Sequence, residues 1–320
     1  MSLRRLLPLA LLAAATQPVL AQNSQCQPYL GNSQTYNVCN AAIDGTVLFT
    51  PALGMIVSGG SPVIGTARNL GSFIHVSLAL RGNATEVVTP DLNYDGTTTK
   101  VGQDQKLWVG TPNVDAAVGV YGGMNGGLLA IDVLGSALLI PTGVVDNLSV
   151  DPDAPKIGSV ALGLGYGLRV GVTHGHGAIP AISVSYMRRH LPRITYGDVP
   201  GGDTYSYGTQ VDADNIRASA SYHFSALEVG GGLGWDNYKS NSDILFRDPV
   251  TNAQEPPINV DVKRSRTLAY LSAGLNFGFF TIGGEAGWQF GKAETLATTF
   301  DGNDPSKTRF FVDGGLRFSF

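Results

Sequence analysis

Residues 310–320, FFVDGGLRFSF, end the chain and decide its fold class. Successive side chains of a β-strand point to opposite faces, so this stretch has one apolar face and one largely polar face. The apolar face carries Phe310, Val312, Gly314, Leu316, Phe318 and Phe320. The other face carries Phe311, Asp313, Gly315, Arg317 and Ser319. The pattern predicts a strand that contacts an apolar medium on one side only.

The same alternation recurs upstream and predicts ten strands, with twelve as the alternative. They cover about residues 72–86, 107–121, 127–140, 158–173, 178–190, 213–224, 226–239, 264–277, 281–292 and 309–320. Pro112 interrupts the second, whose outer part is expected to pair irregularly. Long polar connections alternate with short turns, which is typical of up-and-down antiparallel outer-membrane barrels rather than soluble sandwiches. The long connections are expected near residues 87–106, 141–157, 191–212, 240–263 and 293–308.

Aromatic residues gather in two bands along these strands. The band at the short turns contains Phe224, Phe277, Phe279, Phe280, Phe318 and Phe320, and the second band contains Trp235, Trp288, Phe290 and Phe310. Eight tilted strand residues between the bands rise roughly 20 Å, which is close to the spacing of two membrane interfaces.

The C-terminus resembles the assembly signal of Gram-negative outer-membrane β-barrels. Asp313, Gly315, Phe318 and Phe320 match that signal position by position. The resemblance implies insertion by the outer-membrane assembly machinery and location in the bacterial outer membrane. The expected partners are outer-membrane lipids and lipopolysaccharide, while the oligomeric state stays open.

The N-terminal region divides into an export signal and a segment ahead of the barrel. Residues 1–21 have a charged start, an apolar run and a small-residue cleavage site, so the mature chain is expected to begin at Gln22. Cys26 and Cys39 are the chain's two cysteines, and in an exported protein they are expected to form a disulfide. Residues 22–70 are expected to form a periplasmic or plug segment, and residues 71–320 the barrel.

An apolar stretch at about residues 43–64 is expected to plug the barrel. An eleventh strand would break even parity, and Pro51 and Pro62 suit strand interiors badly. A short helix or irregular segment on the inner wall is therefore predicted, with the disulfide stiffening the tether on the periplasmic side. The arrangement resembles the plug of long-chain fatty-acid transporter-like barrels. Autotransporter translocators end similarly, but only about 50 mature residues precede this barrel, so no passenger is expected.

The alternation places charged side chains on the inner face. The candidates for lining the lumen are Arg81, Asp115, Asp132, Arg169, Arg217, His223, Glu228, Asp236, Glu285, Asp313 and Arg317. They form either a structural ion-pair network or a polar path for a solute, because an isolated buried charge is costly. A symmetric loop over residues 293–308 would place Glu285 opposite Arg317.

These features predict a passive channel or transporter for small molecules, hydrophobic ones among them. The alternatives are a closed structural or surface-interaction barrel and, third, a hydrolase at the rim. No hydrolase elbow, Walker loop or zinc-protease motif occurs, so no enzyme activity, cofactor or metal is expected. The net charge of −4 gives no reason to expect a nucleic-acid surface.

Overall fold

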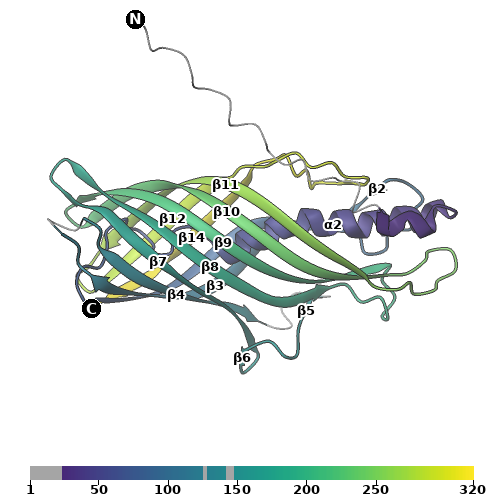
Figure 1. Ribbon diagram of the computed structural model, residues 1–320, viewed down its shortest axis with the longest axis horizontal. Helices are drawn as coiled ribbons and strands as arrows, with labels where there is room; N and C mark the ends of the chain where they lie inside the picture. Colours follow the sequence, from purple (N-terminus) through teal and green to yellow (C-terminus); the bar gives the residue numbers. More distant parts are fainter. Residues whose placement is uncertain (1–23, 125–127, 142–147) are drawn as a thin grey trace, which may run out of the picture.

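The computed structural model describes residues 24–124, 128–141 and 148–320. The predicted signal peptide lies outside these residues. Ten long antiparallel strands close into a barrel around one helix, and the C-terminus lies at the end opposite the outer tip of that helix (Figure 1). The predicted barrel class and strand number are confirmed.

The barrel strands follow one another around the wall, and the first pairs with both the second and the last. They are β1 (Val76–Pro90), β3 (Gln103–Tyr121), β4 (Ile131–Pro141), β7 (Val160–His176), β8 (Ile179–Tyr196), β9 (Tyr205–Phe224), β10 (Leu227–Phe246), β11 (Ile258–Asn276), β12 (Phe280–Gln289) and β14 (Arg309–Ser319). Four short strands lie in the long connections: β2 (Lys100–Val101), β5 (Leu148–Val150), β6 (Lys156–Ile157) and β13 (Thr299–Phe300). β3 pairs with β4 only from Asn113 inward, so the irregularity expected near Pro112 affects one edge of β3.

The half of the barrel nearest the short turns is apolar outside and polar inside. Leu80, Leu168, Leu233, Leu271 and Leu316 are exposed on its outer surface. Exposed aromatic side chains border this surface at both levels: Phe224, Phe277, Phe279 and Phe320 at the short turns, and Trp108, Trp235, Trp288 and Phe310 beyond. An apolar outer surface between two aromatic bands is the lipid-facing surface of a transmembrane barrel.

Beyond the second aromatic band the polarity of the wall reverses. Val211 and Ala213 of β9 are buried inside the barrel, whereas Asp212 and Asp214 between them point outward. β8 to β11 continue in this way for several residues, so much of the expected loops at 191–212 and 240–263 is strand. These expected boundaries are wrong because the outward apolar pattern ends several residues before the strands do.

Helix α2 (Ser33–Ser58) fills the barrel axis and follows the short 3₁₀ helix η1 (Ser24–Tyr29). Asn32 caps α2, since its side-chain oxygen accepts the N–H of Gln34 at 3.2 Å and that of Thr35 at 3.4 Å. Gly59 ends it with a φ of 57°. α2 is long and apolar enough to cross a membrane, but 89% of its most apolar 18-residue window is buried within the protein. The expected plug is confirmed, as a longer helix than predicted.

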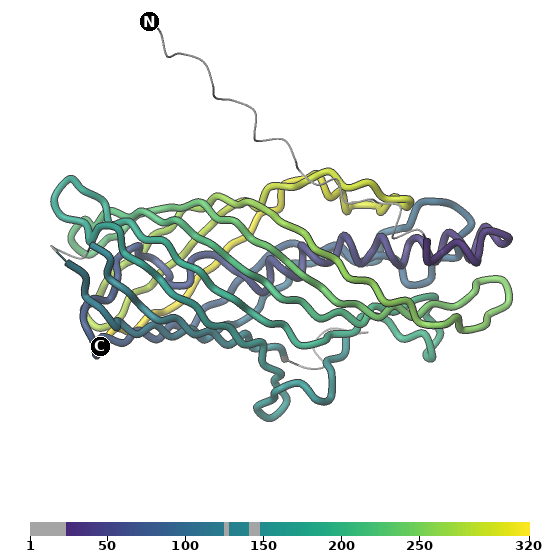
Figure 2. The backbone as a smooth tube through the Cα atoms, in the orientation of Figure 1, coloured from purple at the N-terminus to yellow at the C-terminus, as the bar shows by residue number. Residues whose placement is uncertain are grey.

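The chain runs down the lumen from the long connections toward the short turns (Figure 2). After α2, residues 59–75, here called the linker, continue irregularly to the start of β1. The disulfide between Cys26 and Cys39 is confirmed. It packs with Tyr94 of the first long connection and with Phe246 at the outer end of β10, so the tether expected on the periplasmic side was wrongly placed.

The predicted register between the last two strands is also wrong. Glu285 lies opposite Asp313, and Arg317 lies opposite Thr281. β12 ends at Gln289 rather than near residue 292, so the connection is longer than assumed and the pairing shifts by four residues.

Candidate functional site

The inner wall near the short turns carries most of the charged candidates. Ten of the eleven are buried: Arg81, Asp115, Asp132, Arg169, Arg217, Glu228, Asp236, Glu285, Asp313 and Arg317. The eleventh, His223, is exposed at the short-turn end of β9. The ten buried side chains form three clusters and two separate contacts, all facing the linker or the end of α2.

The first cluster is centred on Arg81 of β1. Its guanidinium donates to Asp115 at 2.5 Å, to Asp313 at 2.6 Å and to the carbonyl oxygen of Ser61 at 2.9 Å. The backbone N–H of Ser61 donates to Glu285 at 2.6 Å. Both backbone polar groups of one linker residue are therefore held by wall charges, as irregular backbone at membrane depth requires.

The second cluster joins β4, β7 and the linker. Arg169 donates to one oxygen of Asp132 from Nη2 at 2.7 Å and from Nε at 2.9 Å. The same carboxylate accepts the side-chain amide of Asn69 at 3.1 Å and the backbone N–H of Leu70 at 3.2 Å. The carboxylate thus neutralises a wall arginine and fixes the linker.

The third cluster lies at the end of α2. Arg217 donates to Asp236 at 2.5 Å and to the carbonyl oxygen of Gly59 at 3.3 Å. The hydroxyl of Tyr238 donates to Asp236 at 2.7 Å. Arg189 is a buried neighbour that sequence reasoning missed, and it donates to Asn215 at 2.6 Å. It falls on the inward phase of β8, so the alternation contained the signal that identifies it.

Glu228 and Arg317 contact the linker separately. Glu228 accepts the hydroxyls of Thr66 at 2.6 Å and Ser221 at 2.5 Å. Arg317 donates to the carbonyl oxygen of Ile64 at 2.9 Å. Sequence reasoning assigned these charges to the wall but did not identify the linker backbone as their partner, because that pairing depends on the path of the linker.

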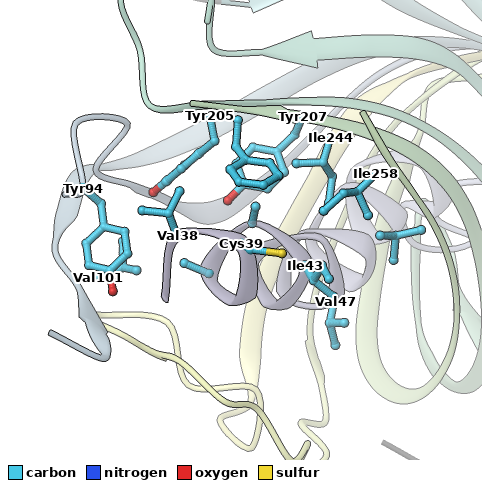
Figure 3. Close-up of a cluster of buried hydrophobic side chains, with 14 of the residues drawn as sticks. Val38, Cys39, Ile43, Val47, Tyr94, Val101, Tyr205, Tyr207, Ile244 and Ile258 are labelled. Atoms are coloured by element: carbon cyan, nitrogen blue, oxygen red, sulfur yellow. The ribbon is translucent and has the colours of Figure 1, made fainter. Parts of the chain in front are cut away.

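Apolar side chains of α2 fill the part of the lumen nearest the long connections. Val38, Cys39, Ile43 and Val47 pack among side chains of the long connections and strand ends (Figure 3). Two hollows between α2 and the wall measure about 10 Å³ each, which is about the space for one water molecule. These two do not admit an organic solute. A third hollow, of about 270 Å³, reaches α2 at Ala52 and is lined by wall residues that include Trp108 and Phe310.

Several buried polar atoms at the boundary between wall and plug lack a hydrogen-bond partner within the described residues. They include Arg169 Nη1, Arg217 Nε, Glu285 Oε1, Asp313 Oδ1 and Arg317 Nε. Unpaired buried polar groups carry a desolvation cost, so this boundary is less tightly satisfied than a usual protein core. Among the residues that the structure describes, no three histidine, cysteine, aspartate or glutamate side chains are grouped to hold a metal ion.

No protein-family model matches the chain. A stretch of 90 residues is 32% identical to outer membrane porin C of Enterobacter cloacae, covering 28% of this chain. The match spans about a fifth of that porin's length, 22%.

Solved barrels show a general likeness. The Escherichia coli outer membrane protease OmpT is 12% identical with a TM-score of 0.38, covering 80% of this chain and 100% of the other. The translocator domain of the autotransporter NalP from Neisseria meningitidis is 13% identical with a TM-score of 0.43, covering 87% and 98%. A FadL homologue of Pseudomonas aeruginosa is 12% identical with a TM-score of 0.25, covering 77% and 89%.

The closed barrel, its lipid-facing belt and its terminal motif identify an outer-membrane β-barrel of bacteria, and the porin match agrees. The predicted location is confirmed.

Proposed function

We propose that the protein is a gated channel for small polar molecules, closed as described and opened when the linker and α2 leave the wall. The observation that carries this proposal is the chemistry of the boundary between wall and linker. Arg81, Glu285 and Arg317 hold the linker through its backbone N–H and C=O groups. Water can replace such partners one for one, so a polar boundary opens at lower cost than an apolar core.

The lining of the opened lumen indicates the class of solute. Withdrawal of the linker exposes arginines and carboxylates on facing strands, such as Arg169 beside Asp132 and Arg217 beside Asp236. Mixed charges attract water and favour small polar solutes of either sign. This surface does not favour the hydrophobic solutes considered from the sequence.

The second candidate is a permanently closed barrel with a structural or surface role. The close packing around Val47 and Leu48 of α2 favours it, since the two hollows there hold only about 10 Å³ each. Neither candidate assigns catalysis to the chain. His190 and Asp212 are a histidine and a carboxylate 2.7 Å apart, but they lie on the outer wall rather than in the lumen. Asp212 also lies 3.8 Å from Arg188.

A reversible cross-link between linker and wall tests the gate. Ile64 contacts the wall at Gly283, where a Cβ would lie 3.0 Å from the Ile64 side chain. Ile64→Cys with Gly283→Cys should form a disulfide that abolishes conductance in planar bilayers, and reductant should restore it. Wild-type protein with and without reductant controls for the native Cys26–Cys39 bond.

Deletion of residues 24–70 provides the complementary measurement. The barrel that lacks residues 24–70 should conduct continuously, with a higher conductance than the wild type. Conductance that persists in the cross-linked form contradicts the gate. If neither the wild type nor a correctly folded deletion variant conducts, the result favours the closed structural barrel.

A further inference from the structure

Two facing glycines form a flat patch on the inner wall, here called the glycine seat. Gly274 of β11 lies directly opposite Gly283 of β12, and both are on the inward phase of their strands. Glycine in the interior of a strand weakens the sheet, and it often marks a place where another backbone approaches closely. The seat lies at the short-turn end of the lumen, which faces the periplasm in outer-membrane barrels.

The linker fills the glycine seat with its backbone. Gly65 has a φ of 74°, a left-handed conformation that favours glycine. A Cβ at Gly274 would lie 2.8 Å from the carbonyl oxygen of Gly65, and a Cβ at Gly283 would lie 3.0 Å from Cγ1 of Ile64. The linker therefore lies so close to the wall that a single added methyl group on the seat would press against it.

Polar contacts hold the linker on both sides of the glycine seat. On one side Arg317 of β14 donates to the carbonyl oxygen of Ile64 at 2.9 Å. On the other side Glu228 of β10 accepts the hydroxyl of Thr66 at 2.6 Å. Four neighbouring strands, β10, β11, β12 and β14, thus bind three consecutive linker residues, 64–66.

The glycine seat differs from these polar contacts in how it responds when the linker leaves. Water can replace the linker as the partner of Arg317 and Glu228, so those contacts oppose release only weakly. The seat holds the linker by close steric fit, for which water is no substitute.

We propose that the glycine seat latches the linker, and that the fit of Ile64 and Gly65 against it sets how often the gate opens. This inference rests on the gated channel proposed above. It places the first step of opening at the short-turn end of the lumen, where the linker leaves the wall before α2 does.

Thiol labelling of the full-length protein measures release of the linker directly. Ala67 is 1% exposed, and the chain's two cysteines form the native disulfide. In an Ala67→Cys background a maleimide therefore reacts at this position alone. Gly274→Ala should raise the labelling rate about tenfold and Gly283→Ala about threefold, because a backbone carbonyl yields less readily than the flexible side chain of Ile64. The open probability in planar bilayers should rise in the same order.

Gly284 is the matched control. It is the next residue of β12 and lies on the outward phase, where a Cβ would lie 3.6 Å from the carbonyl oxygen of Asp313, an ordinary contact. Gly284→Ala should leave the labelling rate and the open probability unchanged. A heat-modifiability gel shows that each compared variant is folded.

A double substitution separates steric fit from general loosening of the barrel. Ile64→Ala removes the atom that a Cβ at Gly283 would press against, so in this background Gly283→Ala should no longer raise the labelling rate. The same rise in both backgrounds, or equal labelling of the Gly274→Ala, Gly283→Ala and Gly284→Ala variants, overturns the latch. If labelling follows the expected order and the open probability does not, the seat is supported and its control of the gate is contradicted. If Gly274→Ala fails to fold, the comparison at Gly283 carries the test.

Discussion

Gly54 allows α2 to pack directly against the ring of Tyr238 on β10. A Cβ at this position would lie 2.4 Å from the ring of Tyr238, closer than any real contact. Helix propensity alone predicts that alanine stabilises a helix by about 1 kcal/mol relative to glycine. Packing predicts that alanine destabilises the folded protein instead. The ring of Tyr238 is held by its hydrogen bond to Asp236 and cannot move away freely.

We therefore expect Gly54→Ala to destabilise the folded protein by about 1–3 kcal/mol. Urea unfolding in micelles measures this as a lower midpoint. Gly31→Ala is the control, because a Cβ there meets nothing within 4 Å. A Gly54→Ala midpoint equal to or above that of the wild type would contradict the packing argument.

The last residue closes the barrel. Phe320 exchanges two backbone hydrogen bonds with Val76, at 3.0 and 2.9 Å, where the final strand meets the first. Deleting Phe320 removes this closure and the terminal position of the assembly motif. The variant should be degraded in the periplasm, and cell fractionation with a heat-modifiability gel should show no folded outer-membrane form. Normal folded protein after the deletion would refute the role assigned to this residue, with Leu30→Ala as a remote control at an exposed position.

Among the elements, strand number was predictable and strand length was not. Alternation locates the lipid-crossing part of β9 from Ile216 to Phe224, because apolar residues point outward there. In the first part of β9, Asp212 and Asp214 point outward. In the sequence alone, this stretch therefore looks like a polar loop. The positions of the lumenal charges also follow from alternation. The register of Glu285 and the path of the linker do not, since they depend on loop geometry and long-range contacts.

We expect the docking of α2 to depend on pH through Asp44. This residue lies above the lipid-facing belt, where its carboxylate accepts the backbone N–H of Thr298 in the last long connection at 2.8 Å. Burial raises the pKa of Asp44 from 3.8 to about 6. The docked state therefore binds a proton more readily than the released state. Docking is strongest at about pH 4 and weakens as pH rises to about 6, by at most about 3 kcal/mol.

Hydrogen exchange of α2 amides, corrected for intrinsic rates, measures this dependence. Protection should be greater at pH 4 than at pH 7. Asp44→Asn keeps an acceptor for Thr298 but does not titrate, so its protection should vary much less. The same pH dependence in Asp44→Asn would exclude this carboxyl as the cause.

At the scale of the whole molecule, the direction of the plug places the N-terminal part of the described chain on the outer face. Short turns of outer-membrane barrels face the periplasm, and the disulfide lies at the opposite end. A protease site inserted after the exposed Leu30 should be cut on intact cells. The same insertion after Gly278, in a short turn, should be cut only after the outer membrane is permeabilised. If the site after Leu30 is cut only in permeabilised cells, this end of the chain faces the periplasm and the assigned orientation is wrong.

The reversal of polarity along β8 to β11 also sets how deeply the barrel is immersed. A shift toward the periplasm would carry Asp212, Lys239 and Lys263 into hydrocarbon, at a cost that grows with depth to about 2–4 kcal/mol per lysine. A shift outward would lift Leu233 and Leu271 into water. The outward residues of these strands therefore favour one depth of the barrel in the membrane, because displacement in either direction costs free energy.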